Sequence, residues 1–541
     1  MFQKALFKHI PLRLINKTTS LAMANPWTYK ALVSSTKPGT LEQIGRRRLM
    51  AMFHKAAERV PHYKRHLQRL GVDHTKIRRP EELLAIVEDI AISKENYKHT
   101  APSPRDLCID GNSYPAQSLM TSSSGYSSGS PTFWVRGKEE LAAQAADVNL
   151  GLSLLVRADK VPTAHLNLFR PGPWVSSPTA NRILGRSGTF IPGDSLTPSG
   201  AITLIRETLA CEAPAFQQMI VYGYPPYLEE MIDVGERMGF DWSSHLIHIT
   251  CAGQTLSESE RSYMKSRLHP DAWIISNLGS SDISASMAFE DPFTIRLRQE
   301  ILNDPTLRRA LAIDPTAREL TLEPSIFAYN CTCYHVVERG SKLYWSTIIP
   351  GAVEPLIMYD LGDTGFVMSQ EVLRERLAQY YNGWQNVRDH FGEAIEFLDI
   401  MPLPIVGVYG RYDGTVDLVG KLISPNIVKD AIIDCGLWGR TSHFTLEELV
   451  IGGVSKGIRV NVGVSEGVLL TDELRQSYLD GVVSYLRRTI EGYQEAVASL
   501  PGAGAIHVEL YPIGKLEEGA IKLRHIKKQE IQGSSDSGEL P

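Results

Sequence analysis

The stretch TSSSGYSSGSPT, residues 121–132, contains six serines and two glycines in twelve residues, and it decides which fold is expected for the chain. Glycines permit positive φ, and serine hydroxyls together with exposed backbone N–H groups can donate to phosphate oxygens. The stretch lacks the G-K-[ST] sequence of a Walker A loop. Ser/Gly-rich segments are also typical of flexible linkers. Composition alone therefore leaves two interpretations open, a linker and a phosphate-binding loop.

Further short motifs follow this stretch in a fixed order. They are CAGQ at Cys251, NLGSSD at Asn277, PLIMYDLGDTG at Pro355, GRYDG at Gly410 and GAIKLR at Gly519. Between them, short apolar runs alternate with helical patterns, which predicts an α/β architecture. Upstream lie AAERVPHYKRHLQRLGV at Ala56 and PEELLAIVEDIAISKENY at Pro80.

The ordered set resembles the adenylate-forming superfamily of acyl- and aryl-CoA synthetases, peptide-synthetase adenylation domains and luciferases, and it is most similar to phenylacetate–CoA ligases. The resemblance runs from about residue 45 to about residue 527. It implies an α/β fold with a large N-terminal adenylation domain of several subdomains, residues 1–409, that binds ATP and the acid. It also implies a small mobile α+β C-terminal domain, residues 410–541, with a hinge at its start.

In the family, the serine-rich loop wraps the β- and γ-phosphates of ATP. The resemblance transfers this role to Ser123, Ser124, Gly125, Ser127, Ser128 and Gly129. The loop is one residue longer between its glycines than the common form, and Ser130 stands where a lysine is frequent. Hydroxyls and amides are therefore expected to do more of the phosphate binding.

The next two motifs are expected around the adenine. Gly253 would line it through its backbone, and Gln254 stands where an acidic residue is usual. NLGSSD is similar to the aromatic-Gly-x-Thr-Glu motif, and the members expected to flank the adenine are Asn277, Leu278, Gly279 and Ser281. The terminal acid becomes Asp282, the expected Mg²⁺ ligand and a catalytic residue, although a turn with a capping aspartate would have the same sequence.

The ribose and the hinge are expected from the last motifs. Asp363 would accept hydrogen bonds from the two ribose hydroxyls, since a carboxylate offers two acceptor oxygens. Arg411 would contact ribose or phosphate, and Asp413 occupies the hinge position. Lys522 in GAIKLR is the expected catalytic lysine, with Lys515 as the alternative, and both could instead be surface charges.

The resemblance implies ATP-dependent activation of a small carboxylic acid, followed by thioester formation with CoA; ATP and Mg²⁺ are the implied cofactors. Transfer to an amine or to a carrier-protein thiol is the alternative, and a nucleotide-binding member without turnover is a third interpretation. An aryl acid is favoured because aromatic residues fall near the expected acyl pocket, although core packing explains them equally well. These residues are Phe169, Trp174, Tyr222, Tyr224 and Tyr227.

Composition excludes several other classes. The chain has 541 residues, a formal charge of −5 and six dispersed cysteines, so it has no basic field for nucleic acid and no disulfide framework. No run of 18 apolar residues is present to span a bilayer, and the basic stretch before Glu42 lacks the apolar core of a signal peptide. A cytoplasmic protein is therefore expected, while the oligomeric state, a homodimer included, stays open.

Local patterns predict three helices and one strand, and they raise the question of a zinc site. Amphipathic helices are predicted at 41–60, 425–435 and 472–490, the second with Ser424 as N-cap, and a half-buried strand at 457–465. Cys331 and Cys333, followed by His335, could belong to a zinc site. Because no second pair matches them, a buried strand that carries two small thiols is favoured.

Overall fold

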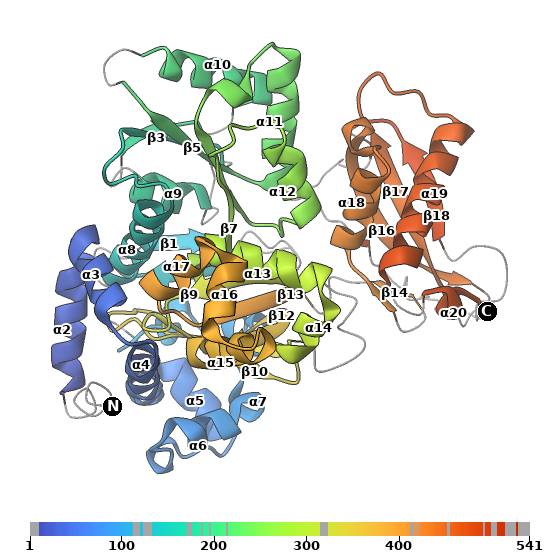
Figure 1. The fold of residues 1–541 in the computed structure, drawn as a ribbon. Helices are drawn as coiled ribbons and strands as arrows, with labels where there is room; N and C mark the ends of the chain where they lie inside the picture. Colours follow the sequence, from blue (N-terminus) through green and yellow to red (C-terminus); the bar gives the residue numbers. More distant parts are fainter. Residues whose placement is uncertain are drawn as a thin grey trace, which may run out of the picture. The chain divides into compact units, whose positions relative to one another are not determined.

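The computed structural model describes residues 10–111, 119–122, 132–169, 176–184, 188–193, 196–211, 215–313, 323–411, 416–418, 421–451, 455–490, 493–498, 506–513, 515 and 526–527. The chain divides into two compact units. One contains residues 1–313 and 324–410, and the other contains residues 314–323 and 411–541. Figure 1 shows the helices and strands of each unit.

An eleven-stranded sheet forms the centre of the first unit, in the order β10-β11-β12-β13-β9-β8-β7-β6-β5-β3-β4. Its strands are β3 (Thr163–Asn167), β4 (Thr189–Pro192), β5 (Gln218–Gly223), β6 (Ile247–Ala252), β7 (Ile274–Ser280), β8 (Ser284–Phe289), β9 (Ser325–Tyr329), β10 (Tyr334–Arg339), β11 (Lys342–Thr347), β12 (Tyr359–Met368) and β13 (Ile405–Arg411).

The half of this sheet that contains β4, β3, β5, β6 and β7 is parallel. Strands β5 and β6 are buried along almost their whole length, as expected of parallel strands covered on both faces. Helices α10 (Pro198–Leu209), α11 (Pro225–Arg237) and α12 (Glu258–Lys265) share one hydrophobic core with these strands. Figure 1 shows the three helices in green next to the strands.

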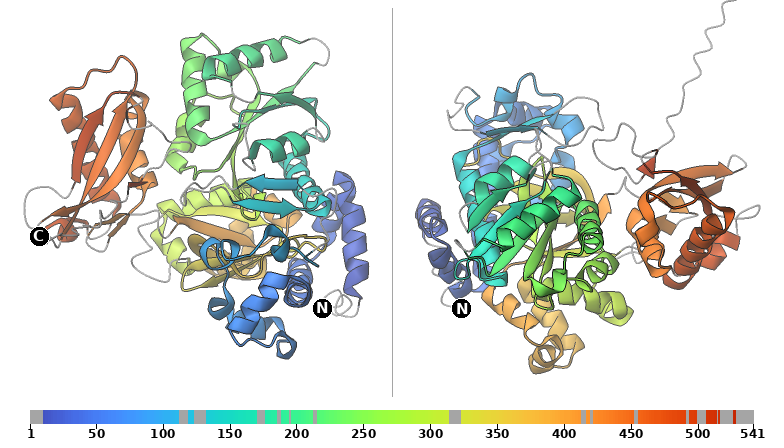
Figure 2. Two further views of the ribbon diagram at one scale, coloured as in Figure 1. Left: turned by 180° about the vertical axis from the view of Figure 1, so that it is seen from behind. Right: turned by 90° about the horizontal axis from the view of Figure 1, so that it is seen from above.

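The other half of the sheet is antiparallel wherever its pairings are described, and the change of direction falls between β7 and β8. Helices α13 (Pro292–Asn303), α14 (Pro305–Ala310), α15 (Gln370–Tyr380), α16 (Trp384–Phe391) and α17 (Ala394–Ile400) also belong to this unit. A separate antiparallel ribbon pairs β1 (Leu119–Ser122) with β2 (Phe133–Arg136) and is shown in cyan in Figure 2. Residues 123–131, which join these two strands, lie outside the described residues.

The N-terminal part is helical. Its elements are α2 (Leu12–Met23), α3 (Pro26–Ser35), α4 (Pro38–Arg59), α5 (Pro61–Arg69), η1 (His74–Lys76), α6 (Pro80–Ala85), α7 (Val87–Ile90), η2 (Lys94–Lys98) and η3 (Pro104–Leu107), followed later by α8 (Lys138–Leu155), α9 (Ser176–Leu184) and η5 (Trp242–Ser244). The predicted helix 41–60 is confirmed as α4. Pro61 is the first residue of the next helix. A backbone N–H at this position has no partner within the helix, so proline loses no hydrogen bond there.

The second unit has its own core and two sheets, a two-stranded one of β14 and β15 and a four-stranded one in the order β18-β17-β16-β19. Its strands are β14 (Val416–Leu418), β15 (Lys421–Ile423), β16 (Thr441–Ile451), β17 (Ser455–Val464), β18 (Ile506–Tyr511) and β19 (Ile526–Lys527), and its helices are α18 (Pro425–Asp434), η7 (Trp438–Arg440), α19 (Asp472–Thr489) and α20 (Tyr493–Ala498). The predicted N-cap is confirmed, because the Ser424 hydroxyl accepts a hydrogen bond from the Ile427 amide at 3.3 Å. The other helix and the strand predicted here are present as α19 and β17.

Among the residues that the structure describes, no helix combines the length and the apolar character needed to cross a membrane.

Candidate functional site

The carboxyl ends of β5, β6 and β7 lie side by side at one edge of the parallel sheet. In the strand register Gly223 pairs with Cys251, and Ala252 pairs with Asn277. Gly253 therefore directly follows β6, while the NLGSSD segment begins at the carboxyl end of the neighbouring strand β7, immediately before the sheet changes direction at β8. In open α/β sheets, ligands bind outside the carboxyl ends of the strands. Two separate sequence motifs are thus brought together.

Gly253 requires the absence of a side chain for two reasons. Its φ is +88°, and a Cβ atom at this position would lie 2.3 Å from Cε1 of Tyr224. The Tyr224 ring therefore packs on the Gly253 backbone, while Phe169 meets it edge-on with ring centroids 5.4 Å apart. Gln254, the next residue, is half-buried. An aromatic wall thus lies beside the residue expected to line the adenine.

Two other predicted pocket aromatics make hydrogen bonds within the fold, and one of them, Tyr222, shares a hydrophobic cluster with Phe169 and Tyr224. The Tyr222 hydroxyl lies 2.8 Å from His165 Nδ1, and Tyr222 is buried. Tyr227 donates its hydroxyl to the backbone oxygen of Leu196 at 2.9 Å. Both side chains are thus used within the fold, and Trp174 lies outside the described residues.

The NLGSSD segment forms the end of β7 and the start of the turn to β8. Asn277 pairs with Phe289 and Leu278 with Ala288, and the register shifts before Ser280. A Cβ at Gly279 would lie 2.2 Å from the Ala285 backbone oxygen, so only glycine fits this close approach. Asn277, Leu278, Gly279 and Ser281 are all half-buried. Leu278, which replaces the family's aromatic residue, packs against the largest core of the first unit.

Asp282 has partners on both carboxylate oxygens. Oδ1 lies 3.3 Å from the Lys94 ammonium, and Oδ2 accepts a hydrogen bond from the Tyr359 hydroxyl at 2.8 Å. The Arg136 guanidinium donates to the Asp282 backbone oxygen. Burial raises the pKa of Tyr359 well above its usual value, and the nearby Asp282 carboxylate adds to this shift. The hydroxyl of Tyr359 therefore stays a donor. Sequence reasoning assigned no role to Lys94, Arg136 or Tyr359, although Lys94 and Tyr359 lie inside quoted motifs.

The fit of Mg²⁺ to Asp282 depends on Lys94. A nucleotide-bound Mg²⁺ takes one or two protein carboxylates together with phosphates and waters, so a single aspartate is a sufficient protein ligand. Within the described part of the chain, no group of three or more His, Cys, Asp or Glu side chains offers another metal site. Asp282 fits the cation once the Lys94 ammonium has left its Oδ1.

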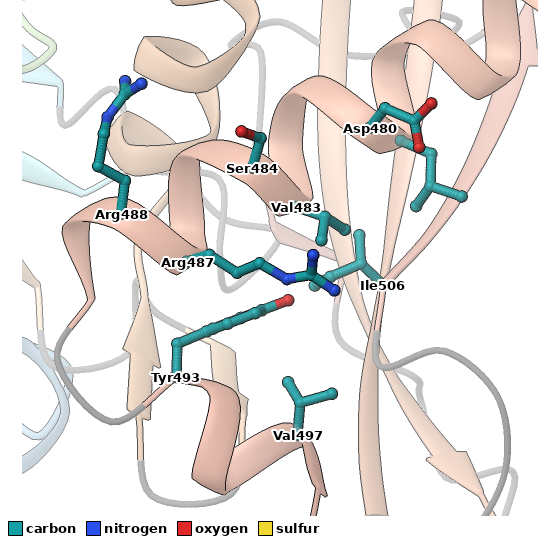
Figure 3. Close-up of a pocket in the computed structure, with 9 residues that line it drawn as sticks. Asp480, Val483, Ser484, Arg487, Arg488, Tyr493, Val497 and Ile506 are labelled. Atoms are coloured by element: carbon teal, nitrogen blue, oxygen red, sulfur yellow. The ribbon is translucent and has the colours of Figure 1, made fainter.

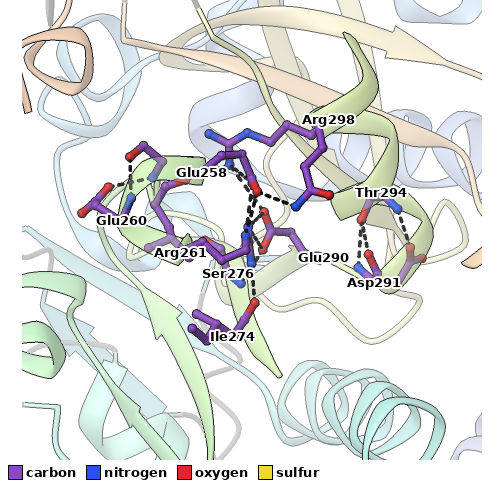
Figure 4. Close-up of polar contacts among 12 residues, drawn as sticks. Glu258, Glu260, Arg261, Ile274, Ser276, Glu290, Asp291, Thr294 and Arg298 are labelled. Carbon is purple, nitrogen blue, oxygen red and sulfur yellow. Dashed lines mark hydrogen bonds and ion pairs between the residues drawn. The ribbon is translucent and has the colours of Figure 1, made fainter. Parts of the chain in front are cut away.

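A buried ionic cluster holds β7 directly before Asn277 (Figure 4). Glu290, fully buried at the end of β8, accepts two hydrogen bonds from Arg261 at 2.7 and 2.8 Å and one from the Ser276 amide at 2.7 Å. Glu258 pairs with Arg261 at 3.1 Å and with Arg298 at 3.5 Å. Burial lowers the pKa of Arg261, but the two carboxylates outweigh it and raise that pKa overall. Helices α12 and α13 and the end of strand β8 are thereby joined to β7.

Asp363 lies on β12, four residues after Tyr359, and is half-buried. Strands β12 and β13 approach closely here, since a Cβ at Gly365 would lie 1.9 Å from the Gly407 backbone oxygen. The Thr364 hydroxyl donates to the Gly410 backbone oxygen at 3.2 Å. Arg411, which is exposed, is the last residue of β13. Met358, which directly precedes Tyr359, is fully buried with a φ of +53°.

The structure does not test the remaining predicted residues. Ser123, Ser124, Gly125, Ser127, Ser128, Gly129, Asp413 and Lys522 lie outside the described residues. Lys515 is described; it is exposed in the second unit, with its ammonium 5.6 Å from the Tyr511 ring centre.

Cys331 and Cys333 are buried, as expected of structural thiols, but the prediction of a strand is wrong. They lie in the turn between β9 and β10, where the Asn330 side chain accepts from the Thr332 amide at 3.0 Å and closes the turn. Burial raises the pKa of the Cys331 thiol.

A hollow of about 690 Å³ lies on the second unit between α19, α20 and β18. Figure 3 shows Arg487 beside Tyr493, extending toward Ile506. None of the predicted site residues lines it.

Comparisons with known proteins give fold matches only. No known family profile and no curated protein matches the sequence. An acyl acid amido synthetase, AtGH3.15 in complex with 2,4-DB, is similar with a TM-score of 0.51 and 12% identity, over 94% of this chain and 95% of its own. The anthranilate CoA ligase AuaEII in complex with anthranoyl-AMP has a TM-score of 0.43 and 12% identity, over 72% of this chain, which spans 63% of the ligase. The amide bond synthetase McbA from Marinactinospora thermotolerans has a TM-score of 0.42 and 11% identity, over 74% of this chain and 67% of its own.

The match to the amido synthetase extends over nearly the whole of both chains, and its mixed α/β architecture agrees with the predicted fold class. The chain therefore shares its overall fold with an acyl acid amido synthetase.

Proposed function

We propose that this protein activates a carboxylic acid with ATP, forming an acyl adenylate and releasing pyrophosphate. The observation that supports this best is that two separate motifs meet at the carboxyl ends of neighbouring parallel strands: Gly253 directly follows β6, and Asn277 of β7 pairs with Ala252. Such an edge suits a flat base held between backbone segments. The fold shared with an acyl acid amido synthetase supports the same reaction class.

Each predicted residue has a specific role in this proposal. Gly253, Gln254 and the segment from Asn277 to Ser281 hold the adenine, and Asp363 accepts hydrogen bonds from the ribose hydroxyls. Arg411 adds a positive charge near ribose or phosphate. The predicted phosphate cradle at 123–129 and Lys522 donate to the phosphate oxygens, and Asp413 is the hinge of the second unit.

The chemistry follows from the need for a leaving group. A carboxylate oxygen of the acid attacks the α-phosphorus of ATP, the bond from that phosphorus to the bridging oxygen breaks, and pyrophosphate leaves with the electron pair. The residues of the chain orient the two reactants and neutralise the charge that grows on the phosphate oxygens. A Mg²⁺ ion bound at Asp282 would add positive charge there.

The acyl acceptor in the proposal is the thiol of CoA, and the acid is aromatic. The rings of Tyr224 and Phe169, which meet edge-on beside Gly253, support an aryl acid, because they offer flat apolar surface next to the adenine edge. An amine acceptor is the second candidate. It is favoured by the full-length similarity to an amido synthetase, whereas the CoA ligase aligns with a smaller part of both chains.

Pyrophosphate–ATP exchange over a panel of aryl, amino and fatty acids tests the adenylation. Exchange with at least one acid is expected. AMP release is then measured with CoA, with amines and with a carrier protein, and the acceptor that accelerates it identifies the second half-reaction. Binding of an ATP analogue without exchange for any acid would instead support a nucleotide-binding protein without turnover.

Asp363→Ala is expected to raise the KM for ATP in this exchange by about 100-fold or more. The estimate follows from losing two hydrogen bonds to a charged acceptor, at about 1.5–3 kcal/mol each. Asp271→Ala removes an aspartate whose side chain is 83% exposed and serves as the control. A normal KM for ATP in the Asp363 variant would remove the ribose assignment.

A further inference from the structure

Lys94 is held in place independently of Asp282. It is the first residue of the short helix η2, whose start is capped by the Ser93 hydroxyl, which accepts hydrogen bonds from the Glu95 and Asn96 amides at 3.2 Å. The helix ends at Lys98, which forms a buried ion pair with Glu354 and lies 4.0 Å from the centre of the Trp134 ring. The backbone that carries Lys94 is therefore fixed at both ends.

Tyr359, which contacts the other carboxylate oxygen of Asp282, is held through its neighbouring backbone. The Ile92 amide donates to the Met358 oxygen at 3.1 Å, and the Asp360 amide donates to the Ile92 oxygen at 2.8 Å. These two bonds join the chain just before η2 to the start of β12. Lys94 and Tyr359 thus converge on Asp282 from two segments that are themselves hydrogen-bonded to each other.

The resulting ion pair is shielded from water, since the side chains of Lys94 and Asp282 are only 18% and 10% exposed. An ammonium group and a divalent cation cannot share one carboxylate without strong repulsion, which is largest where water is excluded. A cation that reaches Asp282 must therefore compete with Lys94. The Tyr359 hydroxyl is neutral, so a cation does not repel it, and it can keep its hydrogen bond to Asp282 Oδ2.

We propose that Lys94 is a built-in counter-ion that a nucleotide-bound divalent cation displaces from Asp282, so that Lys94 sets the metal affinity of the site. This inference rests on the proposed function, because it takes Asp282 as the metal-binding residue of the nucleotide site. Until metal and nucleotide arrive together, the Lys94 ammonium neutralises Asp282 and free cations bind it weakly. Lys94 is a positioning residue for the carboxylate in this scheme.

The test measures Mn²⁺ binding by electron paramagnetic resonance, with and without the non-hydrolysable analogue α,β-methylene-ATP. Lys94→Met keeps the length of the side chain and removes its charge, and it is expected to bind Mn²⁺ about tenfold or more tightly than the native protein. Lys94→Arg restores the charge and should return the affinity toward the native value. The matched control is Lys76→Met, which removes a lysine paired with an aspartate at 3.6 Å on the open surface.

Asp282→Asn distinguishes two claims of the proposal, that Asp282 binds the metal and that Lys94 competes with it. If Asp282→Asn loses Mn²⁺ binding while Lys94→Met binds as the native protein does, Asp282 holds the metal and the competition is disproved. If Asp282→Asn binds Mn²⁺ and nucleotide normally, the metal assignment fails and the inference fails with it, while pyrophosphate exchange still tests adenylation.

A second measurement uses the unaltered protein, so it does not depend on how a variant folds. The rate at which acetic anhydride modifies Lys94 is followed by mass spectrometry, with Lys76 as the internal reference. The rate is expected to rise several-fold when Mn²⁺ and the analogue are added together, because the ammonium has left its carboxylate. An unchanged ratio of the two lysine rates would overturn the proposal.

Discussion

At the scale of single residues, Gly253 gives the most direct test of the site. An alanine there must adopt a φ of +88° and also place its Cβ against the Tyr224 ring. Gly253→Ala is therefore expected to lower the rate of pyrophosphate exchange by an order of magnitude or more, because the backbone at the adenine edge has to shift.

The matched control is Gly239→Ala. Gly239 has a φ of +69°, but nothing lies within 4 Å of its added Cβ, so this variant has the backbone strain without the clash. Combining Gly253→Ala with Tyr224→Ala should restore part of the exchange. Equal effects of the two glycine variants would mean that Gly253 serves the fold and not the site.

The residues that sequence reasoning found and those it missed differ in a physical way. Gly253, Gly279 and Asp282 carry local signals, since glycines at close approaches and a terminal acid leave a short pattern. Lys94 and Tyr359 act on Asp282 across sequence separations of 188 and 77 residues. No local pattern encodes such a contact, so only the fold could reveal it.

At the scale of elements, the position of β7 depends on Glu290. This carboxylate is fully buried and neutralises two arginines that are also buried. Glu290→Gln leaves those two charges with Glu258 as their remaining carboxylate partner, and removing one member of a buried ion pair typically costs about 3–5 kcal/mol. We expect the free energy of unfolding of the first unit to fall by that amount in denaturant titrations, and amide exchange in 274–280 to accelerate.

Glu81→Gln is the control for that prediction, because its partner Arg46 lies 3.9 Å away and both side chains are more than half exposed. Exposed pairs contribute little to stability, so this variant should unfold like the native protein. If Glu290→Gln also unfolds normally, packing and not charge holds β7.

Elements with strong local signals were predictable, and strand pairings were not. α18 combines a serine cap, a proline in its first turn and apolar residues at helical spacing, all of which are visible in sequence. The eleven-stranded order, by contrast, places β13 between β12 and β9. That arrangement joins segments about 80 residues apart in sequence. The strand predicted at Cys331 is a turn in the structure, because the burial of this thiol comes from tertiary contacts.

At the scale of the whole molecule, the order of the motifs predicted the fold although each motif alone is weak. Neither a family profile nor a curated relative matches the chain, so the fold is retained at very low sequence identity. The predicted serine-rich cradle, the hinge at Asp413 and the catalytic lysine stay predictions, because they lie outside the described residues.

The two units have separate hydrophobic cores, and this leads to a prediction about unfolding. Leu228 is fully buried in a core of the first unit, and Leu486 is fully buried in the core of the second. Truncating a buried leucine to alanine typically costs about 2–5 kcal/mol. A chain with two cores is not expected to unfold in a single all-or-none step, so calorimetry should show two transitions. Leu486→Ala should lower the midpoint of one transition and Leu228→Ala that of the other. If each variant instead lowers a single common transition, the two cores unfold as one cooperative unit.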